Sequence, residues 1–125
     1  FSPLANGFLT ARYDAGSRFE QGSDYRSVMP QFTAEGTEKN RPLLELLHNI
    51  AAEKNATPGQ LSMAWMLCKK PWIVPIPGTR KLQRMVENAG AAEVILTPEE
   101  VGAIDRALDR MEMSEVFGGS RIAKR

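Results

Sequence analysis

Apolar residues recur at helical spacing between residues 42 and 54. Those that share one face of such a helix are Leu43, Leu44, Leu46, Leu47, Ile50 and Ala51. Pro42 suits the first helical position, because the N–H that it lacks has no helical partner there. Asn55 tolerates the left-handed conformation that commonly follows a helix, so the pattern predicts a helix that ends near this residue.

Two further helices share one start signal. Thr57 and Thr97 are each followed by proline, and Gln60 or Glu100 stands three residues after the threonine. This is the capping-box pattern, in which two side chains satisfy backbone N–H groups that the first helical turn leaves unpaired. The pattern predicts two helices, at residues 58–69 and 98–111.

A short strand and a fourth helix fit between these two. The β-branched run 73–76 predicts a buried strand over residues 72–77, although Pro75 and Pro77 cannot donate to a strand ladder. From residue 81 the helical spacing returns, and Gly90 is expected to close that helix. Its shared apolar face carries Leu82, Met85, Val86 and Ala89.

The first 40 residues show no sustained periodicity. Pro3 forces the residue before it to be extended, and Asn6-Gly7 permits positive φ, so residues 1–11 are predicted to be the end of a strand and a loop. Residues 12–40 predict one long loop, and loops of that length are more often functional than merely connective. The tail 112–125 is also predicted to be loop.

The order of these elements predicts an α/β fold, mostly helical, with short parallel strands joined by helical crossovers. Two strands alone form no stable sheet, and the chain begins with Phe1 instead of Met. We therefore expect a part of a longer protein. Unpaired strand edges and uncovered helix faces predict that such a part self-associates.

Composition narrows the function classes. Hydrophobic residues make up 42% and charged residues 25% of the chain, as in ordinary globular proteins. The net charge of +1 gives no general reason to expect a nucleic-acid or membrane partner, and no apolar run approaches the roughly 20 residues that span a bilayer. Cys68, the one cysteine, lies in an apolar run and is predicted to be a buried small hydrophobe, which fits a reducing cytoplasm.

The groups most suited to binding an anion lie at residues 76–84. A short strand runs into the turn at Gly78 and then into a helix start, so free backbone N–H groups and the positive helix end converge. Thr79 adds a hydroxyl, and three cations that can hold a phosphate follow at Arg80, Lys81 and Arg84. Arg80 and Arg84 face one anion if the helix begins by Arg80. On these residues alone, an anion site and a solvated helix start stay equally open.

The rest of the sequence indicates no reaction centre. The loop at residues 2–7 could lay its backbone against a ligand, but a simple turn explains it better. His48 shares the polar side of its helix with Glu45 and Asn49, and no second metal ligand stands at a suitable spacing. Trp65, Trp72 and the six methionines are predicted to be core. No catalytic triad, carboxylate pair or metal cluster emerges.

Four segments together resemble the aldo-keto reductase family. FSPLANGFLTA at 1–11 is similar to the YSPLxxGxLTG stretch that follows strand seven of that family. TPGQLSMAW at 57–65 resembles its TPAQLALAW helix, and IPGTRKLQRMVEN at 76–88 resembles its IPGTRxxxRxxEN segment after strand eight. LTPEE at 96–100 resembles the start of its last helix. The order and spacing match over most of the chain and favour the bacterial general aldo-keto reductase or oxidoreductase branch.

The resemblance implies the C-terminal part of a (β/α)₈ TIM barrel, whose loops at the C-terminal strand ends form the site. It implies NADPH as the cofactor, with a small-molecule aldehyde or ketone reduced to an alcohol by hydride transfer. The basic residues favour NADPH over NADH. The residues assigned to the pyrophosphate side are Ser2, Pro3, Leu4 and Gly7. Those assigned to the 2′-phosphate are Gly78, Thr79, Arg80 and Arg84, and those assigned to adenine are Glu87 and Asn88.

The catalytic Asp, Tyr, Lys and His of the family belong to the first half of the barrel, and nothing in this chain matches them. Tyr13, Tyr25 and His48 stand in the wrong places. We therefore expect the full-length protein to be a carbonyl reductase, and we expect this chain alone to be inactive. The resemblance leaves open a non-catalytic NADPH-binding barrel that serves a protein partner, as in potassium-channel β subunits. A nucleic-acid role has only the helix content in its favour.

Overall fold

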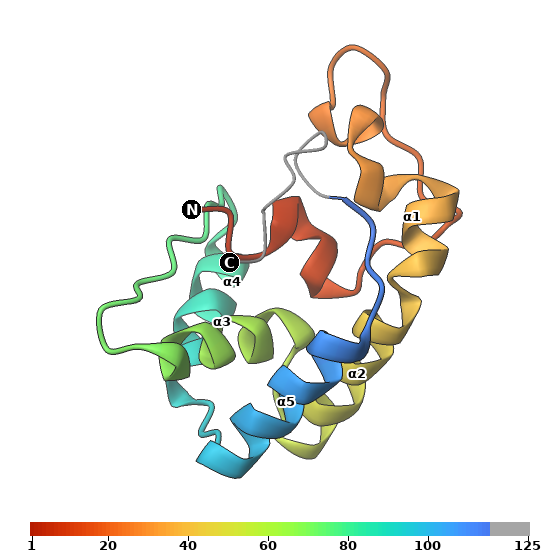
Figure 1. Ribbon diagram of the computed structural model, residues 1–125. Coiled ribbons are helices and arrows are strands. Elements are labelled where there is room, and N and C mark those ends of the chain that lie inside the picture. The colour runs from red at the N-terminus through yellow and green to blue at the C-terminus, as the bar shows by residue number, and fades with distance from the viewer. Residues whose placement is uncertain (116–125) are drawn as a thin grey trace.

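The computed structural model describes residues 1–115, and its regular elements are helices (Figure 1). The α-helices are α1 (Ala34–Lys39), α2 (Arg41–Glu53), α3 (Pro58–Lys69), α4 (Leu82–Ala89) and α5 (Pro98–Arg110). Short 3-10 helices are η1 (Ala5–Thr10), η2 (Tyr25–Val28), η3 (Pro30–Phe32) and η4 (Gly90–Glu93).

The predicted helix starts at Thr57 and Thr97 are confirmed. The Thr57 hydroxyl accepts from the Gln60 backbone N–H at 3.2 Å, and the Gln60 side-chain Oε1 accepts from the Thr57 backbone N–H at 2.9 Å. Thr97 and Glu100 repeat the arrangement at 3.2 and 2.8 Å. Because these bonds span only three residues, the local sequence decides them without help from the rest of the fold.

The other helix predictions hold with small shifts at the ends. Helix α2 begins at Arg41, one residue before Pro42, and Asn55 adopts the predicted left-handed conformation with φ 51° just after the helix. Helix α4 begins at Leu82 and meets Gly90 at its C-terminal end. Boundary shifts of one or two residues are normal, since helix ends fray.

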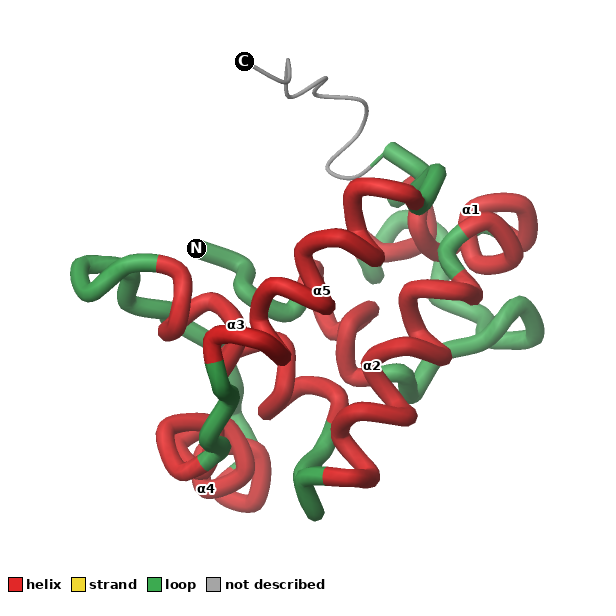
Figure 2. Tube along the Cα trace, turned by 60° about the horizontal axis from the view of Figure 1, so that its bottom comes forward, coloured by secondary structure: helices red, strands yellow, loops and turns green. Residues whose placement is uncertain are grey.

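Helices α2, α3 and α5 enclose the main core. Helix α5 lies alongside α2 and α3 in both views (Figures 1 and 2). The buried side chains between them are Leu47, Ala51, Leu61, Ala64, Leu96 and Ile104. Burial of each large aliphatic side chain stabilises the fold by about 1.5–3 kcal/mol relative to exposure.

Residues 12–40 are more ordered than the predicted loop. They contain η2, η3 and α1, and an aromatic cluster holds them to η1. The Phe32 ring centroid lies 5.6 Å from that of Phe8, 5.6 Å from that of Tyr13 and 4.9 Å from that of Phe19, each pair close to edge-to-face. Such pairs add about 0.5–1.5 kcal/mol each beyond burial. Sequence periodicity missed this packing, because the aromatic residues are spread too far along the chain to show a period.

No β-strand occurs in residues 1–115, so both predicted strands are corrected. Residues 1–11 form turns and η1 instead of a strand end, and Ser2 has φ 48° instead of the extended conformation predicted before Pro3. Asn6 and Gly7 do take the predicted positive φ, at 57° and 93°. Residues 72–77 have no ladder partner in the described part of the chain, and Pro75 and Pro77 lack the N–H groups that a ladder needs.

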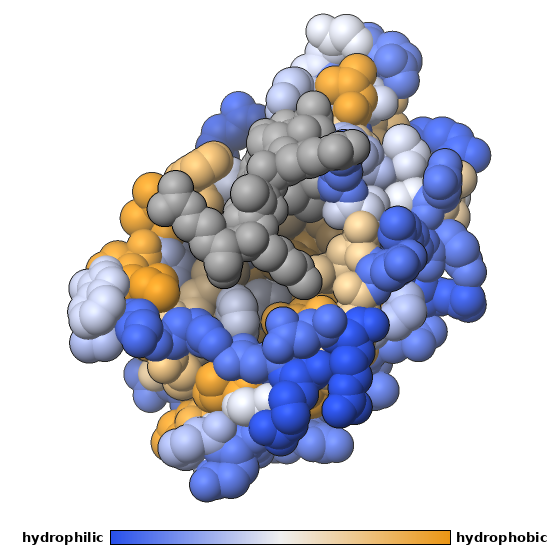
Figure 3. Space-filling view, in the orientation of Figure 1, coloured by the Kyte–Doolittle hydropathy of each residue, from blue (hydrophilic) through white to orange (hydrophobic). Residues whose placement is uncertain are grey.

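The segment 72–77 still alternates in exposure with the period of a strand. Trp72, Val74 and Ile76 are 74%, 74% and 63% exposed. The residues between them, Ile73, Pro75 and Pro77, are half-buried. The segment therefore leaves three large apolar side chains mostly uncovered by the described residues. Figure 3 shows apolar surface gathered along this edge of the molecule, at the left.

Several residues predicted to be core are exposed. Cys68 is exposed, and so are Trp72, Met85 and Met113, at 74%, 56% and 42%. Met29 and Met63 are buried as predicted, each at 2% exposure. The exposed residues lie on surfaces that no other described element covers, and sequence apolarity alone cannot reveal that.

No helix within residues 1–115 has both the length and the apolar character needed to cross a membrane. Residues 111–115 follow α5 without regular structure. The remainder of the tail that was predicted to be loop, residues 116–125, lies outside the described residues.

Candidate functional site

A cavity of about 810 Å³ lies between the first ten residues and the segment that leads into α4. Nine of the ten residues predicted to bind a cofactor line it: Ser2, Pro3, Leu4, Gly7, Gly78, Thr79, Arg80, Arg84 and Asn88. Glu87 does not. The structure thus brings together two predicted loops that are about 70 residues apart in the sequence.

The first wall of the cavity is a tightly turned backbone. Ser2, Ala5, Asn6 and Gly7 all have positive φ, and the Gly7 N–H donates to the Leu4 carbonyl at 2.9 Å. This wall rests on α3 at Gly59, where an added Cβ would lie 3.6 Å from side-chain carbons of both Leu4 and Thr10. These are ordinary van der Waals distances, so the wall lies one methyl group away from the Gly59 backbone.

The second wall is the helix start that the sequence singled out. The Thr79 hydroxyl accepts from the Lys81 N–H at 3.1 Å, and α4 begins one residue later without a side-chain cap. Arg80 therefore precedes the helix, and the expected helical i, i+4 relation between Arg80 and Arg84 is not formed. Both arginines line the cavity nevertheless.

The second wall is strongly cationic. Arg80, Lys81 and Arg84 line the cavity, and none of them forms an ion pair with any residue that the structure describes. A Cβ added at Gly78 would meet nothing within 4 Å, so the backbone there is open to the cavity. Free guanidinium groups beside an open backbone suit a phosphate group.

Four other residues that line the cavity were not predicted from the sequence as site residues: Tyr13, Asp24, Tyr25 and Arg26. Arg26 Nη1 donates to the Tyr13 hydroxyl oxygen at 2.5 Å, and its Nε and Nη2 donate to the Asp24 carboxylate at 2.5–3.2 Å. These hydrogen bonds from Arg26 lower the pKa of Asp24, and the carboxylate in turn raises the pKa of Arg26. The only signal of this group in the sequence was the length of the predicted loop 12–40, since loops of that length are often functional.

Glu87 is not among the residues that line the cavity. Its carboxylate Oε2 accepts from Arg12 Nη2 at 3.0 Å, and its side chain is 19% exposed. Its backbone carbonyl accepts from Gln60 Nε2 at 2.8 Å. Gln60 belongs to the capping box of α3, so one side chain both caps α3 and holds α4.

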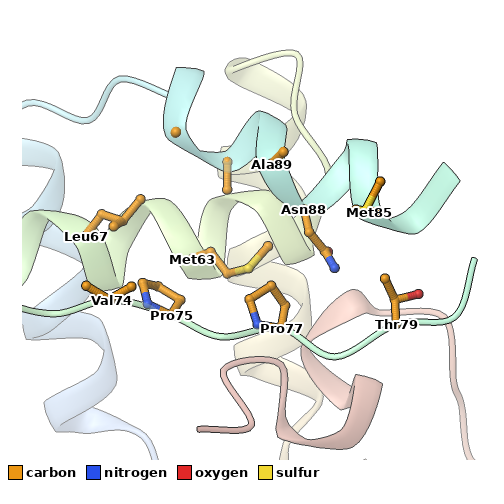
Figure 4. Close-up of a pocket in the computed structure, with 11 residues that line it drawn as sticks. Met63, Leu67, Val74, Pro75, Pro77, Thr79, Met85, Asn88 and Ala89 are labelled. Atoms are coloured by element: carbon orange, nitrogen blue, oxygen red, sulfur yellow. The ribbon is translucent and has the colours of Figure 1, made fainter. Parts of the chain in front are cut away.

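A second cavity of about 340 Å³ lies on the other side of the same segment, between α3 and α4 (Figure 4). Met63 and Leu67 of α3 and Met85 and Ala89 of α4 line it, together with Pro75 and other residues of the segment. Its lining is mostly apolar, and its two polar members, Thr79 and Asn88, also line the larger cavity. We assign no binding role to it.

Of the residues set aside as catalytic candidates, Tyr13 and Tyr25 line the larger cavity, whereas His48 does not. His48 is exposed on α2 and faces a separate hollow with Glu45 and Asn49. The Tyr13 hydroxyl is held by Arg26. Within residues 1–115, no three His, Cys, Asp or Glu side chains are placed to hold a metal ion.

The comparisons with known proteins agree with the family that the sequence resembles. The family model of the Aldo/keto reductase family matches residues 1–109. The chain is 39% identical over 113 residues to aldo-keto reductase str7 of Strobilurus tenacellus. It is 40% identical over 113 residues to aldo-keto reductase yakc [NADP(+)] of Schizosaccharomyces pombe. Each match covers 90% of this chain but 33% of the relative, so the chain spans a third of the length of these proteins. Because the family model matches far more than half of its residues, the chain belongs to the aldo/keto reductase family.

Proposed function

We propose that this chain is the cofactor-binding part of an NADPH-dependent oxidoreductase that reduces aldehydes or ketones to alcohols by hydride transfer. The observation that carries the proposal is the cavity of about 810 Å³, where two loops meet around cations that have no described ion-pair partner. Membership of the family supports the reaction class, and the name of one relative includes NADP(+).

The two walls suit different parts of the cofactor. We assign the 2′-phosphate to Thr79, Arg80 and Arg84, with the open backbone of Gly78 beside them, because guanidinium groups grip a phosphate through paired hydrogen bonds. We assign the pyrophosphate to the turned backbone of the first wall, at Ser2, Pro3, Leu4 and Gly7. Asn88 lines the cavity beyond Arg84 and suits the adenine. When bound, NADPH would supply the hydride for the carbonyl carbon of the substrate.

We infer that the catalytic Asp, Tyr, Lys and His of the family lie outside these 125 residues, and that this chain alone binds cofactor without reducing a carbonyl. The length of the relatives supports this, since the chain spans 33% of them. We further propose that the full-length protein is a cytoplasmic TIM barrel of which these residues form the C-terminal part. The segment 76–88 supports the bacterial branch, whereas the two relatives are fungal.

The test measures NADPH and NADH affinity by fluorescence titration of the full-length protein. Removal of a guanidinium from a phosphate contact costs about 1.5–3 kcal/mol, so we expect Arg80→Met and Arg84→Met each to weaken NADPH binding roughly tenfold or more. NADH lacks the 2′-phosphate, so its affinity should change little. Arg41→Met is the control, because Arg41 is exposed on α2 and pairs with Glu38 away from the cavity.

Equal affinity for NADPH and NADH, with both arginine variants unchanged, would exclude the assigned phosphate site. Tight NADPH binding without reduction of any aldehyde or ketone would favour the non-catalytic binding module over the enzyme.

A further inference from the structure

The side-chain amide of Gln60 is shared between two helices. Its Oε1 accepts from the Thr57 backbone N–H at 2.9 Å and completes the capping box of α3. Its Nε2 donates to the backbone carbonyl of Glu87, in the last turn of α4, at 2.8 Å. Within residues 1–115, no other hydrogen bond joins α3 to α4. Since the last carbonyls of a helix lack helical partners, this donor stabilises the end of α4 and also ties it to α3.

Apolar packing between these two helices is incomplete beside the bond. The cavity of about 340 Å³ lies between Met63 and Leu67 of α3 and Met85 and Ala89 of α4 (Figure 4). Side chains that face a cavity have no contact atoms on that side, so they gain less dispersion energy than fully packed ones. The hydrogen bond from Gln60 therefore supplements packing that alone holds α4 only partly.

Gly90, which directly follows α4, lies close against the same amide. A Cβ at this position would lie 2.7 Å from Gln60 Nε2, and among the described residues it would meet only the Gln60 side chain within 4 Å. The backbone at Gly90 has φ −62°, which any residue adopts. The local conformation therefore does not require glycine, whereas the approach of the Gln60 amide does.

Helix α4 carries two residues of the cofactor cavity. Arg84 and Asn88 line it, and Asn88 directly follows Glu87, whose carbonyl accepts from Gln60. A ligand that contacts this helix gains affinity when the helix is held in the binding position before the ligand arrives. The bond from Gln60 acts on the turn of α4 that carries one of these contacts and follows the other.

We propose that Gln60 is a positioning residue for the cofactor. Its amide, in the space that Gly90 leaves free, holds α4 so that Arg84 and Asn88 meet the ligand. The inference rests on the proposed function, because it concerns affinity for the same cofactor. Gln60 does not line the cavity, so it acts through α4 and makes no contact with the ligand.

The experiment measures the dissociation constants of NADPH and NADH for the full-length protein by fluorescence titration. Gln60→Glu keeps the oxygen that caps α3 but places a second oxygen against the Glu87 carbonyl, where an N–H donated before. Gly90→Ala displaces the amide and leaves Gln60 itself unchanged. The two variants thus remove one hydrogen bond by independent routes, and melting curves check that each of them folds.

Each variant has a matched control. Glu100→Gln also changes one atom of a capping-box side chain, and it turns the contact of that side chain with the Lys54 ammonium from attractive to repulsive. Gly102→Ala also adds a methyl group against the flexible end of a side chain, that of Arg106. None of these residues lines the cavity.

We expect Gln60→Glu and Gly90→Ala each to weaken NADPH binding about fivefold, as the loss of one hydrogen bond implies. NADH should weaken only about twofold, because it has no 2′-phosphate for Arg84 to bind. A general loss of stability would not change the ratio of the two dissociation constants, so this ratio distinguishes positioning from a purely structural role. Both controls should keep the wild-type constants.

Four results would overturn the proposal. Wild-type affinity in both folded variants would mean that the bond does not position α4. A loss in only one of them would mean that the added charge or the added methyl group weakens binding, and not the lost hydrogen bond. An equal loss for NADPH and NADH would mean that Arg84 is not displaced. A wild-type protein that binds neither cofactor would overturn the proposed function together with this inference, and it is recognised before any variant is compared.

Discussion

The hydroxyl oxygen of Tyr13 accepts a 2.5 Å hydrogen bond from the guanidinium of Arg26. The same guanidinium carbon lies 5.0 Å from the centroid of the Tyr13 ring and 4.5 Å from that of Phe19. Arg26 is thus held by an acceptor, two aromatic faces and the Asp24 carboxylate at once. This contact ties the loop after η1 to η2 along the third side of the cavity.

Removal of the Tyr13 hydroxyl should lower the free energy of unfolding less than replacement of Arg26. Tyr13→Phe keeps the ring contacts and loses one hydrogen bond, so we expect the free energy of unfolding to fall by about 1 kcal/mol. Arg26→Met also removes the ion pair and both cation–π contacts, and we expect a clearly larger loss. Urea unfolding followed by circular dichroism measures both. An equal loss for the two variants would contradict this account of Arg26.

Gly36 has no room for a side chain. A Cβ at this position would lie 2.0 Å from the Pro30 carbonyl oxygen, which belongs to the backbone and cannot swing away. We expect Gly36→Ala to lower the free energy of unfolding by about 3 kcal/mol, measured by urea unfolding. Gly102→Ala in α5 is the control: its Cβ would meet only the flexible end of Arg106 at 3.2 Å. That variant should gain up to about 1 kcal/mol through helix propensity, and a loss as large as that of Gly36→Ala would refute the steric argument.

Substitution of Gly78 should leave the stability of the fold unchanged but weaken cofactor binding. Its Cβ would enter open space, so Gly78→Ala should unfold at the wild-type urea concentration. If a phosphate approaches this backbone, the added methyl group will stand in its way. We expect NADPH affinity to fall about tenfold, equivalent to 1.4 kcal/mol. Unchanged affinity in the fluorescence titration would place the phosphate elsewhere.

Acid should destabilise the link between α3 and α5. The Lys69 ammonium, and then the Trp65 indole N–H, hydrogen-bond the Asp105 carboxylate and lower its pKa, while partial burial opposes them. Because the folded pKa lies below the unfolded one, the stability it contributes is present above about pH 4 and is lost as the pH falls further.

The same reasoning applies to Glu100, whose pKa is lowered by Lys54, and to Asp24, whose pKa is lowered by Arg26. Asp105→Asn removes one of these three titrations. Relative to wild type it should be less stable at pH 7, and it should lose less stability between pH 7 and pH 3 in urea unfolding. An identical pH dependence for the two proteins would show that Asp105 contributes nothing to acid sensitivity.

Residues 1–125 on their own should self-associate. Trp72, Val74 and Ile76 are mostly exposed in their segment, and Leu82 and Val86 of α4 are 71% and 64% exposed. Apolar surface of this extent drives association unless another part of a protein covers it. Sedimentation velocity should show species larger than a monomer at micromolar concentration, and Val74→Glu with Ile76→Glu should shift the population toward the monomer. A wild-type monomer at every concentration, with cooperative melting, would contradict this expectation.

Most local signals in the sequence were reliable where bonds span few residues, although Ser2 before Pro3 has φ 48° instead of the predicted extended conformation. The capping boxes at Thr57 and Thr97, the positive φ at Asn6 and the left-handed Asn55 were each confirmed. In every case the hydrogen bonds or the sterics lie within four residues, so the neighbouring sequence is the whole environment that matters.

Several predictions that depended on distant neighbours failed, although Met29 and Met63 are buried as predicted. Trp72 and Cys68 are apolar or weakly polar and were expected inside, yet no described element covers them. The segment 72–77 keeps the alternation of a strand but no ladder, because a strand needs a partner that the pattern of one segment cannot supply. The helical relation of Arg80 to Arg84 failed for a smaller reason, since α4 begins at Leu82.

For the candidate site, the sequence determined the residue types and the resemblance that grouped them, including the basic helix start at Arg80–Arg84 and the turn at Ser2–Gly7. Only the tertiary structure decided that these two loops share one cavity, that Asp24 and Arg26 border it, and that Glu87 is paired with Arg12. The physical reason is distance along the chain. Capping and turn energies are set by adjacent residues, whereas an ion pair across 75 positions forms only after packing on α3 has fixed both of its ends.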